Sequence, residues 1–248
     1  MAVEIHWEEH LEVLKRSFSP TLVIEGRDDY ICLRGLEEKF IESGFTIFPV
    51  KGKSNVIEIF KRRSDIQNTQ VIFLVDNDEW LIFGKPSEFD EPTFLTTDGW
   101  SIENDMLRDG TSENLMSVTE REQFEREFAN FSQYFAAALQ DYADNGEDAV
   151  HRYRTHPNQV LTDGGDLTAD AQSAVDQINL SQTIQEKFFS DVRKAMRGKS
   201  LLSLYTRLLS KNSRASKYSA INLLEMSAAT RGPHYQRIES QVEEMLGI

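Results

Sequence analysis

The sequence predicts an α/β fold in which an open, mostly parallel, Rossmann-like sheet is followed by a C-terminal helical domain. Two observations lead to this prediction. Short apolar runs alternate with segments of helical periodicity up to about Asp109, and helical periodicity dominates after it. The order strand, helix, strand, helix, strand, strand, helix is typical of an open sheet with right-handed crossovers. We therefore expect an α/β domain with an N-terminal helix (1–110) and a helical domain (111–248).

Four apolar runs are the predicted strands of the first domain. They are "LVIE" (22–25), "FTIFPV" (45–50), "QVIFLVD" (70–76) and "TFLTT" (93–97). The third run is almost unbroken and rich in β-branched residues, which is typical of a parallel strand covered on both faces. Helical spacing of apolar residues predicts helices over 4–17, 30–41 and around 56–60, with a further short helix beginning at Ile102.

Helices alone are expected in the second domain. Their predicted ranges are 118–143, 169–196, 199–211, 216–229 and 234–246. The segment "THPNQVLTDGGD" (155–166) contains a proline and paired glycines, so it is expected to be a loop.

Composition limits the class of protein. A chain of 248 residues with 40% hydrophobic content can bury a full core. The single cysteine, Cys32, excludes an intrachain disulfide and a cysteine-based zinc site. Neither a signal peptide nor a run of about 18 apolar residues is found, so a soluble, cytoplasmic protein without a membrane partner is expected.

Charge is distributed unevenly along the chain. The net charge is −14, yet the segment 187–237 carries +9, which leaves −23 on the rest. Such asymmetry indicates either a surface for nucleic acid or a surface for an acidic protein partner. The phosphate-binding candidates in this segment are Arg193, Lys194, Arg197 and Lys199. A solvated helix face is the alternative for these four residues.

Four carboxylates are expected to meet at one edge of the sheet. Glu25 ends the first strand and Asp76 ends the third, while Asp29 and Asp78 follow them by four and two residues. Open α/β sheets place their sites just beyond the carboxyl ends of the strands. Carboxylates held close together repel one another unless a cation compensates, and oxygen-only ligand sets suit Mg²⁺ or Mn²⁺. The sequence therefore predicts a site for one or two such ions.

The motifs "VIEGRDD" and, about fifty residues later, "FLVDND" resemble those of the Toprim family, which includes topoisomerases, primases and nucleases. The resemblance covers residues 20–108 and implies a Toprim-like fold. It also implies that Glu25 acts as acid, base or metal ligand, that Asp76 and Asp78 hold metal, and that Asp29 serves a second metal. Trp80 stands where Toprim domains often have a glycine.

"FPVKGKSNV" (48–56) and "WSIEND" (100–105) further resemble a Toprim-like subgroup of anti-phage toxins encoded beside an ABC-type ATPase, such as the toxin subunits of PARIS systems. Lys51 and Lys53 are expected either to bind a substrate phosphate or to lie in a solvated loop. Glu103 is expected either to ligate the metal, to support a ligand, or only to stabilise the start of its helix. Neither "KGKS" nor "RGKS" has the glycine that an ATP-binding phosphate loop requires.

These features favour a metal-dependent phosphodiesterase, more readily an RNase, with tRNA favoured by the resemblance, than a DNase. The alternative is a regulatory protein whose main role is to bind a partner, the ABC-type ATPase implied by the resemblance. A homodimer is also expected. Haloacid-dehalogenase phosphatases are a weaker alternative, because they place Asp-x-Asp after the first strand and here it follows the third. Response-regulator receivers are weaker too, because the Asp-x-Asp doublet and the long helical tail fit them poorly.

Overall fold

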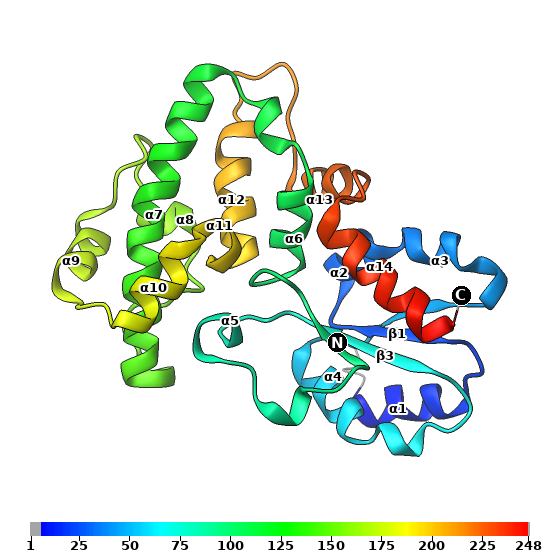
Figure 1. The fold of residues 1–248 in the computed structure, drawn as a ribbon. Helices are drawn as coiled ribbons and strands as arrows, with labels where there is room; N and C mark the ends of the chain where they lie inside the picture. Colours follow the sequence, from blue (N-terminus) through cyan, green and yellow to red (C-terminus); the bar gives the residue numbers. More distant parts are fainter. Residues whose placement is uncertain (1–5, 248) are drawn as a thin grey trace.

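A four-stranded sheet lies at the centre of the N-terminal part of the chain. The computed structural model describes residues 6–247, and the sheet in it is parallel throughout, with the order β2-β1-β3-β4 (Figure 1). The strands are β1 (Thr21–Ile24), β2 (Thr46–Pro49), β3 (Val71–Val75) and β4 (Phe94–Thr96). Each strand coincides with a predicted apolar run, so the predicted α/β fold with a mostly parallel sheet is confirmed.

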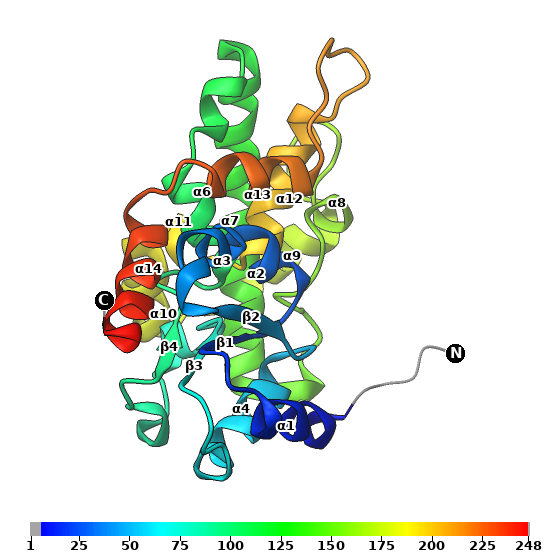
Figure 2. The ribbon, with the colours of Figure 1, turned by 90° about the vertical axis from the view of Figure 1, so that its right-hand side faces the viewer.

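Helices cover both faces of this sheet (Figure 2). On one face lie α1 (Trp7–Arg16) and α4 (Lys53–Lys61), and on the other lie α2 (Arg27–Leu33), α3 (Gly35–Lys39) and α6 (Ile102–Asp109). Alternate residues of β1 serve the two cores, since Val23 packs toward α1 and α4 and Leu22 and Ile24 pack toward the opposite side. Residues 4 and 5 of the predicted first helix lie outside the described residues.

The C-terminal part consists of helices, as expected. They are α7 (Val118–Asn145), α8 (Pro157–Val160), α9 (Ala169–Gln177), α10 (Gln182–Ser190), α11 (Val192–Ala195), α12 (Gly198–Leu209), α13 (Ala220–Ala228) and α14 (Pro233–Leu246). Short 3₁₀ turns occupy Ile41–Ser43, Arg63–Asp65, Ser87–Phe89, Ser112–Leu115 and Gly146–Asp148. Two short helices were not predicted, α5 (Trp80–Phe83) after β3 and α8 within the expected loop 155–166.

The single helix predicted over 169–196 is wrong, because the segment forms α9, α10 and α11. Capping side chains start the second and third of these helices. The Ser181 hydroxyl accepts a hydrogen bond from the backbone N–H of Ile184, and the Asp191 carboxylate accepts one from Lys194 N–H. Such caps satisfy the free N–H groups of a first turn, so they favour a new helix over continuation of the old one.

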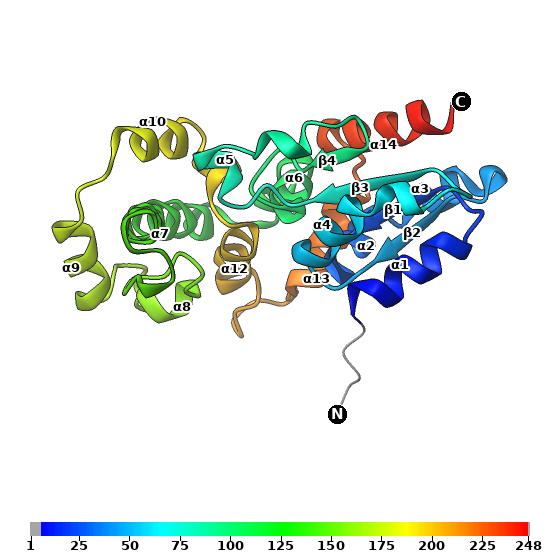
Figure 3. The same cartoon turned by 90° about the horizontal axis from the view of Figure 1, so that it is seen from below.

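One apolar core joins the two parts of the chain. Leu22 of β1 belongs to the same cluster of buried residues as Phe135 of α7, Leu204 of α12 and Ile238 of α14. The last two helices return to the α/β part, where α13 packs on α2 and α6 and α14 packs on α6. In contrast, α7, α8 and α9 extend away from the sheet (Figure 3). Among residues 6–247, no helix combines the length and the apolar character needed to cross a bilayer.

Candidate functional site

A pocket of about 440 Å³ opens at the carboxyl edge of the sheet. Glu25 follows β1, Asp76 follows β3, and α6 begins beside them, so the parallel strands deliver their terminal acids to one place. The lining residues are Glu25, Gly26, Arg27, Asp28, Asp29, Lys51, Gly52, Asp76, Glu103 and Lys199. The structure thus brings together three of the four predicted carboxylates and Glu103, whose role the sequence left open, and it adds Asp28.

Backbone N–H groups hold three of these carboxylates in place. Glu25 Oε1 accepts a hydrogen bond from Asp76 N–H at 2.8 Å, and Asp76 Oδ1 accepts one from Ile102 N–H at 2.9 Å. Asp29 Oδ2 accepts one from Gly26 N–H at 2.6 Å. The second oxygen of each carboxylate makes no hydrogen bond to a described residue, so one oxygen is anchored and the other is available to a ligand.

Burial and mutual repulsion raise the pKa values of the carboxylates in this cluster, so they retain protons more readily than exposed carboxylates do. Desolvation, followed by the charge of neighbouring carboxylates, raises the pKa of Asp29 to about 8. Desolvation likewise raises the pKa of Glu25 to about 7, with the charges of Asp78 and Glu103 acting in the same direction. The pKa of Asp76 lies well above its usual range for the same reasons. A bound cation would relieve this repulsion.

The ligand atoms of the cluster suit a hard divalent cation, although the carboxylates do not converge on a single metal position. Within residues 6–247, no three Asp, Glu, His or Cys side chains converge closely enough to hold a metal ion as they stand. The donors are all carboxylate oxygens, with one anchored and one available oxygen on each of Glu25, Asp29 and Asp76. Metal binding therefore requires the available oxygens to move together.

Glu103 is buried beside the pocket and is not merely a charge at a helix end. Its side chain is 2% exposed, and one of its oxygens accepts a hydrogen bond from the Ser101 hydroxyl. The same helix start donates the N–H of Ile102 to Asp76. The motif "WSIEND" indicates this position of Glu103, because a serine cap places the next three residues in the first turn of α6.

Asp78 is not part of the pocket lining, and its carboxylate pairs with Lys53. Its backbone adopts a left-handed φ of 50°, and its carboxylate lies 3.2 Å from Lys53 Nζ. That ammonium group also donates hydrogen bonds to the carbonyl oxygens of Asp76 and Asn77 at 2.7 and 3.1 Å, and it lies 3.7 Å from the centre of the Trp80 ring. Lys53 therefore braces the loop after β3, and Trp80 contributes a cation–π contact where Toprim domains often have a glycine.

Three cations lie at the pocket. Lys199 reaches it from α12, with Nζ 3.1 Å from Asp28 Oδ2 and 3.9 Å from Glu103 Oε1. Lys51 is exposed and adopts a left-handed φ of 62°, and the N–H of the following Gly52 donates to the Glu25 carbonyl at 2.7 Å. Arg27 is also exposed there, and sequence reasoning missed it, because it lies within the acidic "GRDD" turn.

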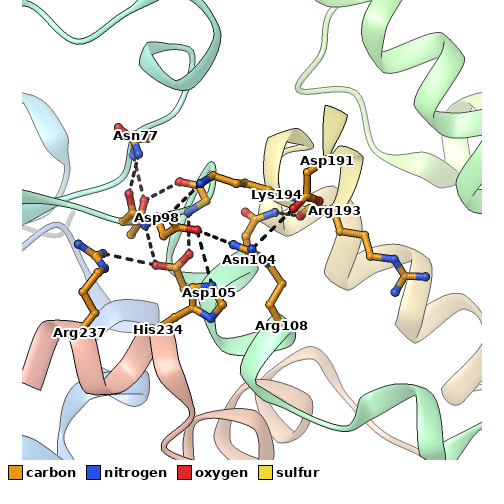
Figure 4. A network of polar contacts seen from close by, with 12 residues as sticks. Asn77, Asp98, Asn104, Asp105, Arg108, Asp191, Arg193, Lys194, His234 and Arg237 are labelled. Atoms are coloured by element: carbon orange, nitrogen blue, oxygen red, sulfur yellow. Dashed lines mark hydrogen bonds and ion pairs between the residues drawn. The ribbon is translucent and has the colours of Figure 1, made fainter. Parts of the chain in front are cut away.

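Arg193 and Lys194 lie outside the pocket, in a separate polar network (Figure 4). The Arg193 guanidinium pairs with Glu113 and with Glu125, the latter at 2.9 Å, and Lys194 Nζ lies 2.8 Å from Asp98 Oδ1. Other cations of the basic segment 187–237 are also paired within the chain, Arg207 with Glu127 and Arg214 with Glu120. Arg197 is half-buried and forms no ion pair with a described residue. Much of the +9 charge is therefore balanced by the chain's own acids.

The same network fixes the start of α12 and so the position of Lys199. Asn104 of α6 donates hydrogen bonds to the carbonyl oxygens of Arg193 and Met196 at 2.7 and 2.8 Å (Figure 4). Gly198 packs so closely on the start of α6 that an added Cβ would lie 2.2 Å from Ser101 Oγ. Sequence reasoning missed Asn104 and Gly198, because these contacts join residues about ninety positions apart.

A serine–histidine pair elsewhere in the chain has no catalytic geometry. Ser203 Oγ lies 2.9 Å from His156 Nε2, but His156 Nδ1 already accepts a hydrogen bond from the N–H of Asn158. In the neutral ring Nε2 must then carry the proton, so the histidine donates to the serine and cannot deprotonate it. This pair is a structural contact.

In comparisons with known proteins, no family model matches the chain and no curated protein shows significant similarity to it. The functional argument therefore rests on the residues of the pocket.

Proposed function

We propose that the chain is a divalent-metal-dependent nuclease with a Toprim-like domain, and that RNA, tRNA in particular, is its substrate. The observation that carries this proposal is the composition of the pocket. Buried carboxylates form one part of its lining, and Arg27, Lys51 and Lys199 form another. Such a site offers oxygen ligands to a cation and positive charge to the phosphates around it.

Residues of the chain have distinct roles in this proposal. Glu25, Asp29, Asp76 and Glu103 would hold one or two Mg²⁺ or Mn²⁺ ions, which supply activation of the attacking oxygen and stabilise charge on the phosphate. Glu25, whose pKa of about 7 lies near neutrality, is suited to accept or donate a proton. Asp78 supports the site by holding Lys53, and Lys199 and Lys51 orient the phosphate backbone.

Cleavage of labelled RNA and DNA by the purified protein with Mg²⁺ or Mn²⁺ tests the proposal. We expect Glu25→Gln and Asp76→Asn to lower the rate by about 100-fold or more, since each removes a ligand or an acid–base group. Glu42→Gln and Asp65→Asn are matched controls, because both residues are exposed and lie in short 3₁₀ turns that do not line the pocket. Equal rates for wild type and Glu25→Gln would exclude this function.

Metal binding has a readout that does not depend on activity. At pH 8, Mn²⁺ should raise the melting temperature of the wild type, because it binds the folded state and relieves carboxylate repulsion. Asp76→Asn removes one of the carboxylates offered to the ion, so the melting temperature of this variant should respond less to Mn²⁺. If neither Mn²⁺ nor Mg²⁺ changes the melting temperature of the wild type, a metal-dependent mechanism is contradicted.

The proposal includes restraint by a partner. The resemblance to anti-phage toxins implies an ABC-type ATPase as that partner and a homodimer as the active form. Co-expression with a neighbouring ATPase gene and co-purification tests the first part, and light scattering of the purified chain tests the second.

A further inference from the structure

The segment "HRYRTH" (151–156) carries two arginines without ion pairs, and it packs on Trp100, the residue before the Ser101 cap of α6. Arg152 and Arg154 are both exposed, and neither forms an ion pair with any residue in 6–247. In this they differ from Arg193, Lys194 and Arg207, which the chain's own carboxylates neutralise. Residues 151–156 are called the basic strip below.

The middle of the basic strip packs on Trp100, which is hydrogen-bonded to the loop that carries Asp78. Tyr153 is 4% exposed and packs edge-on against Trp100, with 5.6 Å between ring centres. The carbonyl oxygen of Trp100 accepts a hydrogen bond from Asp78 N–H at 2.7 Å. Partial burial acts to lower the pKa of Arg154, but Tyr153, followed by the charges of Glu79 and Asp78, raises it overall. The strip thus contacts the segment after β4, which is hydrogen-bonded in turn to the loop after β3.

The end of the basic strip is anchored on α12. His156 Nε2 lies 2.9 Å from Ser203 Oγ. Ser203 follows Lys199 by four residues, so both project from the same face of α12, about one turn of 5.4 Å apart. The strip therefore runs from Trp100, after β4, to a point one helical turn from the lysine that lines the pocket.

We propose that the basic strip is the surface along which a nucleic-acid backbone passes to or from the pocket, with Arg152 and Arg154 contacting its phosphates. This inference rests on the proposed function and names the path of the substrate. A chain of net charge −14 repels a polyanion, so binding depends on cations that internal carboxylates do not neutralise. Arginine suits the role, because its planar guanidinium can donate two parallel hydrogen bonds to a phosphate.

The test is a binding measurement without metal, so that no cleavage occurs. The anisotropy of labelled single-stranded RNA and DNA of one sequence is measured in EDTA, between about 50 and 200 mM salt. The variant is Arg152→Gln with Arg154→Gln. The control is Arg16→Gln with Arg62→Gln, which makes the same charge change at exposed positions shortly before β1 and β3, at the opposite edge of the sheet from the pocket.

The expected result is lower affinity for the strip variant, with a slope of log affinity against log salt reduced by about 1.4, or about 0.7 for each lost phosphate contact. The control should keep the slope of the wild type. Loss with RNA, with DNA or with both supports the inference and identifies the polymer. Wild-type affinity and slope in the strip variant overturn it, as does failure of the wild type to bind either polymer.

A parallel cleavage assay of Glu25→Gln separates the two proposals. If this variant cuts like the wild type, the nuclease proposal fails while the anisotropy result still decides the strip. If it is inactive and the strip variant binds normally, only the strip is overturned. Circular dichroism spectra and melting temperatures of both double variants show that the comparison is made between folded proteins.

Discussion

Asp98 is the side chain on which the polar network of Figure 4 converges. Its carboxylate lies 2.6 Å from Arg108 of α6 and 2.8 Å from Lys194 of α11. Burial acts to raise the pKa of Asp98, but the hydrogen bonds and charges of Lys194 and Arg108 outweigh it and lower the pKa to about 2. The stabilisation is therefore fully present above the unfolded pKa, near 4, and is lost as the pH falls toward 2.

Asp98→Asn should accordingly reduce the free energy of unfolding by about 1–2 kcal/mol at pH 7, a value discounted for the partial exposure of the three side chains. The difference from wild type should shrink as the pH falls from about 4 to 2, because the wild-type carboxylate then becomes protonated. Urea unfolding over this pH range measures it, with Asp65→Asn as an exposed control. A difference that does not change with pH would contradict the role of the ion pairs.

At the scale of single residues, the sequence identifies the acids of the pocket better than the cations. Glu25 and Asp76 are predictable because each directly follows an apolar run that can only be a strand. The direction of Asp78 is not predictable, because it depends on one left-handed backbone angle and on Lys53. The partners of Arg193 are Glu113 and Glu125, which lie about 70 to 80 residues away, so the sequence does not show that its charge is neutralised.

At the scale of elements, the docking of α12 on α6 decides where Lys199 lies. Gly198→Ala would place a Cβ 2.2 Å from Ser101 Oγ and 2.8 Å from Glu103 Cβ, so the two helix starts would have to separate. We expect a loss of stability of about 1–3 kcal/mol in urea unfolding, together with weaker substrate binding. Gly164→Ala is the control, since Gly164 is exposed and its nearest contacts would be an ordinary 3.7 Å. Equal stability of the two variants would show that the close contact is not important.

The sequence predicts helices and strands well where a single hydrophobic period runs through the segment. It predicts them poorly where a capping side chain ends one helix and begins another. The four strands and α7 match their predicted ranges because their apolar patterns are unbroken. The division of 169–196 into three helices depends on Ser181 and Asp191, which read equally well as polar residues on a helix surface. The docking of α13 on α6 depends on packing between distant segments, which periodicity does not encode.

At the scale of the whole molecule, the two parts of the chain share their core. Leu223 of α13 and Ile238 and Val242 of α14 are fully buried, and they belong to the cluster that contains Leu22 and Ile24 of β1. The C-terminal helices thus cover a face of the α/β part, and through α12 they also supply Lys199 to the pocket. A division at residue 110 would separate the carboxylates from this cation.

This shared core predicts that the chain unfolds as one unit. Trp100 lies in the large cluster and Trp7 and Trp80 pack on the other face of the sheet, so tryptophan fluorescence reports the α/β part. Far-UV circular dichroism reports mainly the helices after residue 111. The two signals should give one urea midpoint, because neither part can lose its packing while the other keeps it.

A fragment of residues 1–110 should show no cooperative transition, since the surfaces of α2 and α6 that α13 and α14 cover would be exposed. Two separate midpoints, or a fragment that unfolds cooperatively, would instead establish two independent domains. A partner could then control the access of Lys199 to the pocket by acting at the boundary between them.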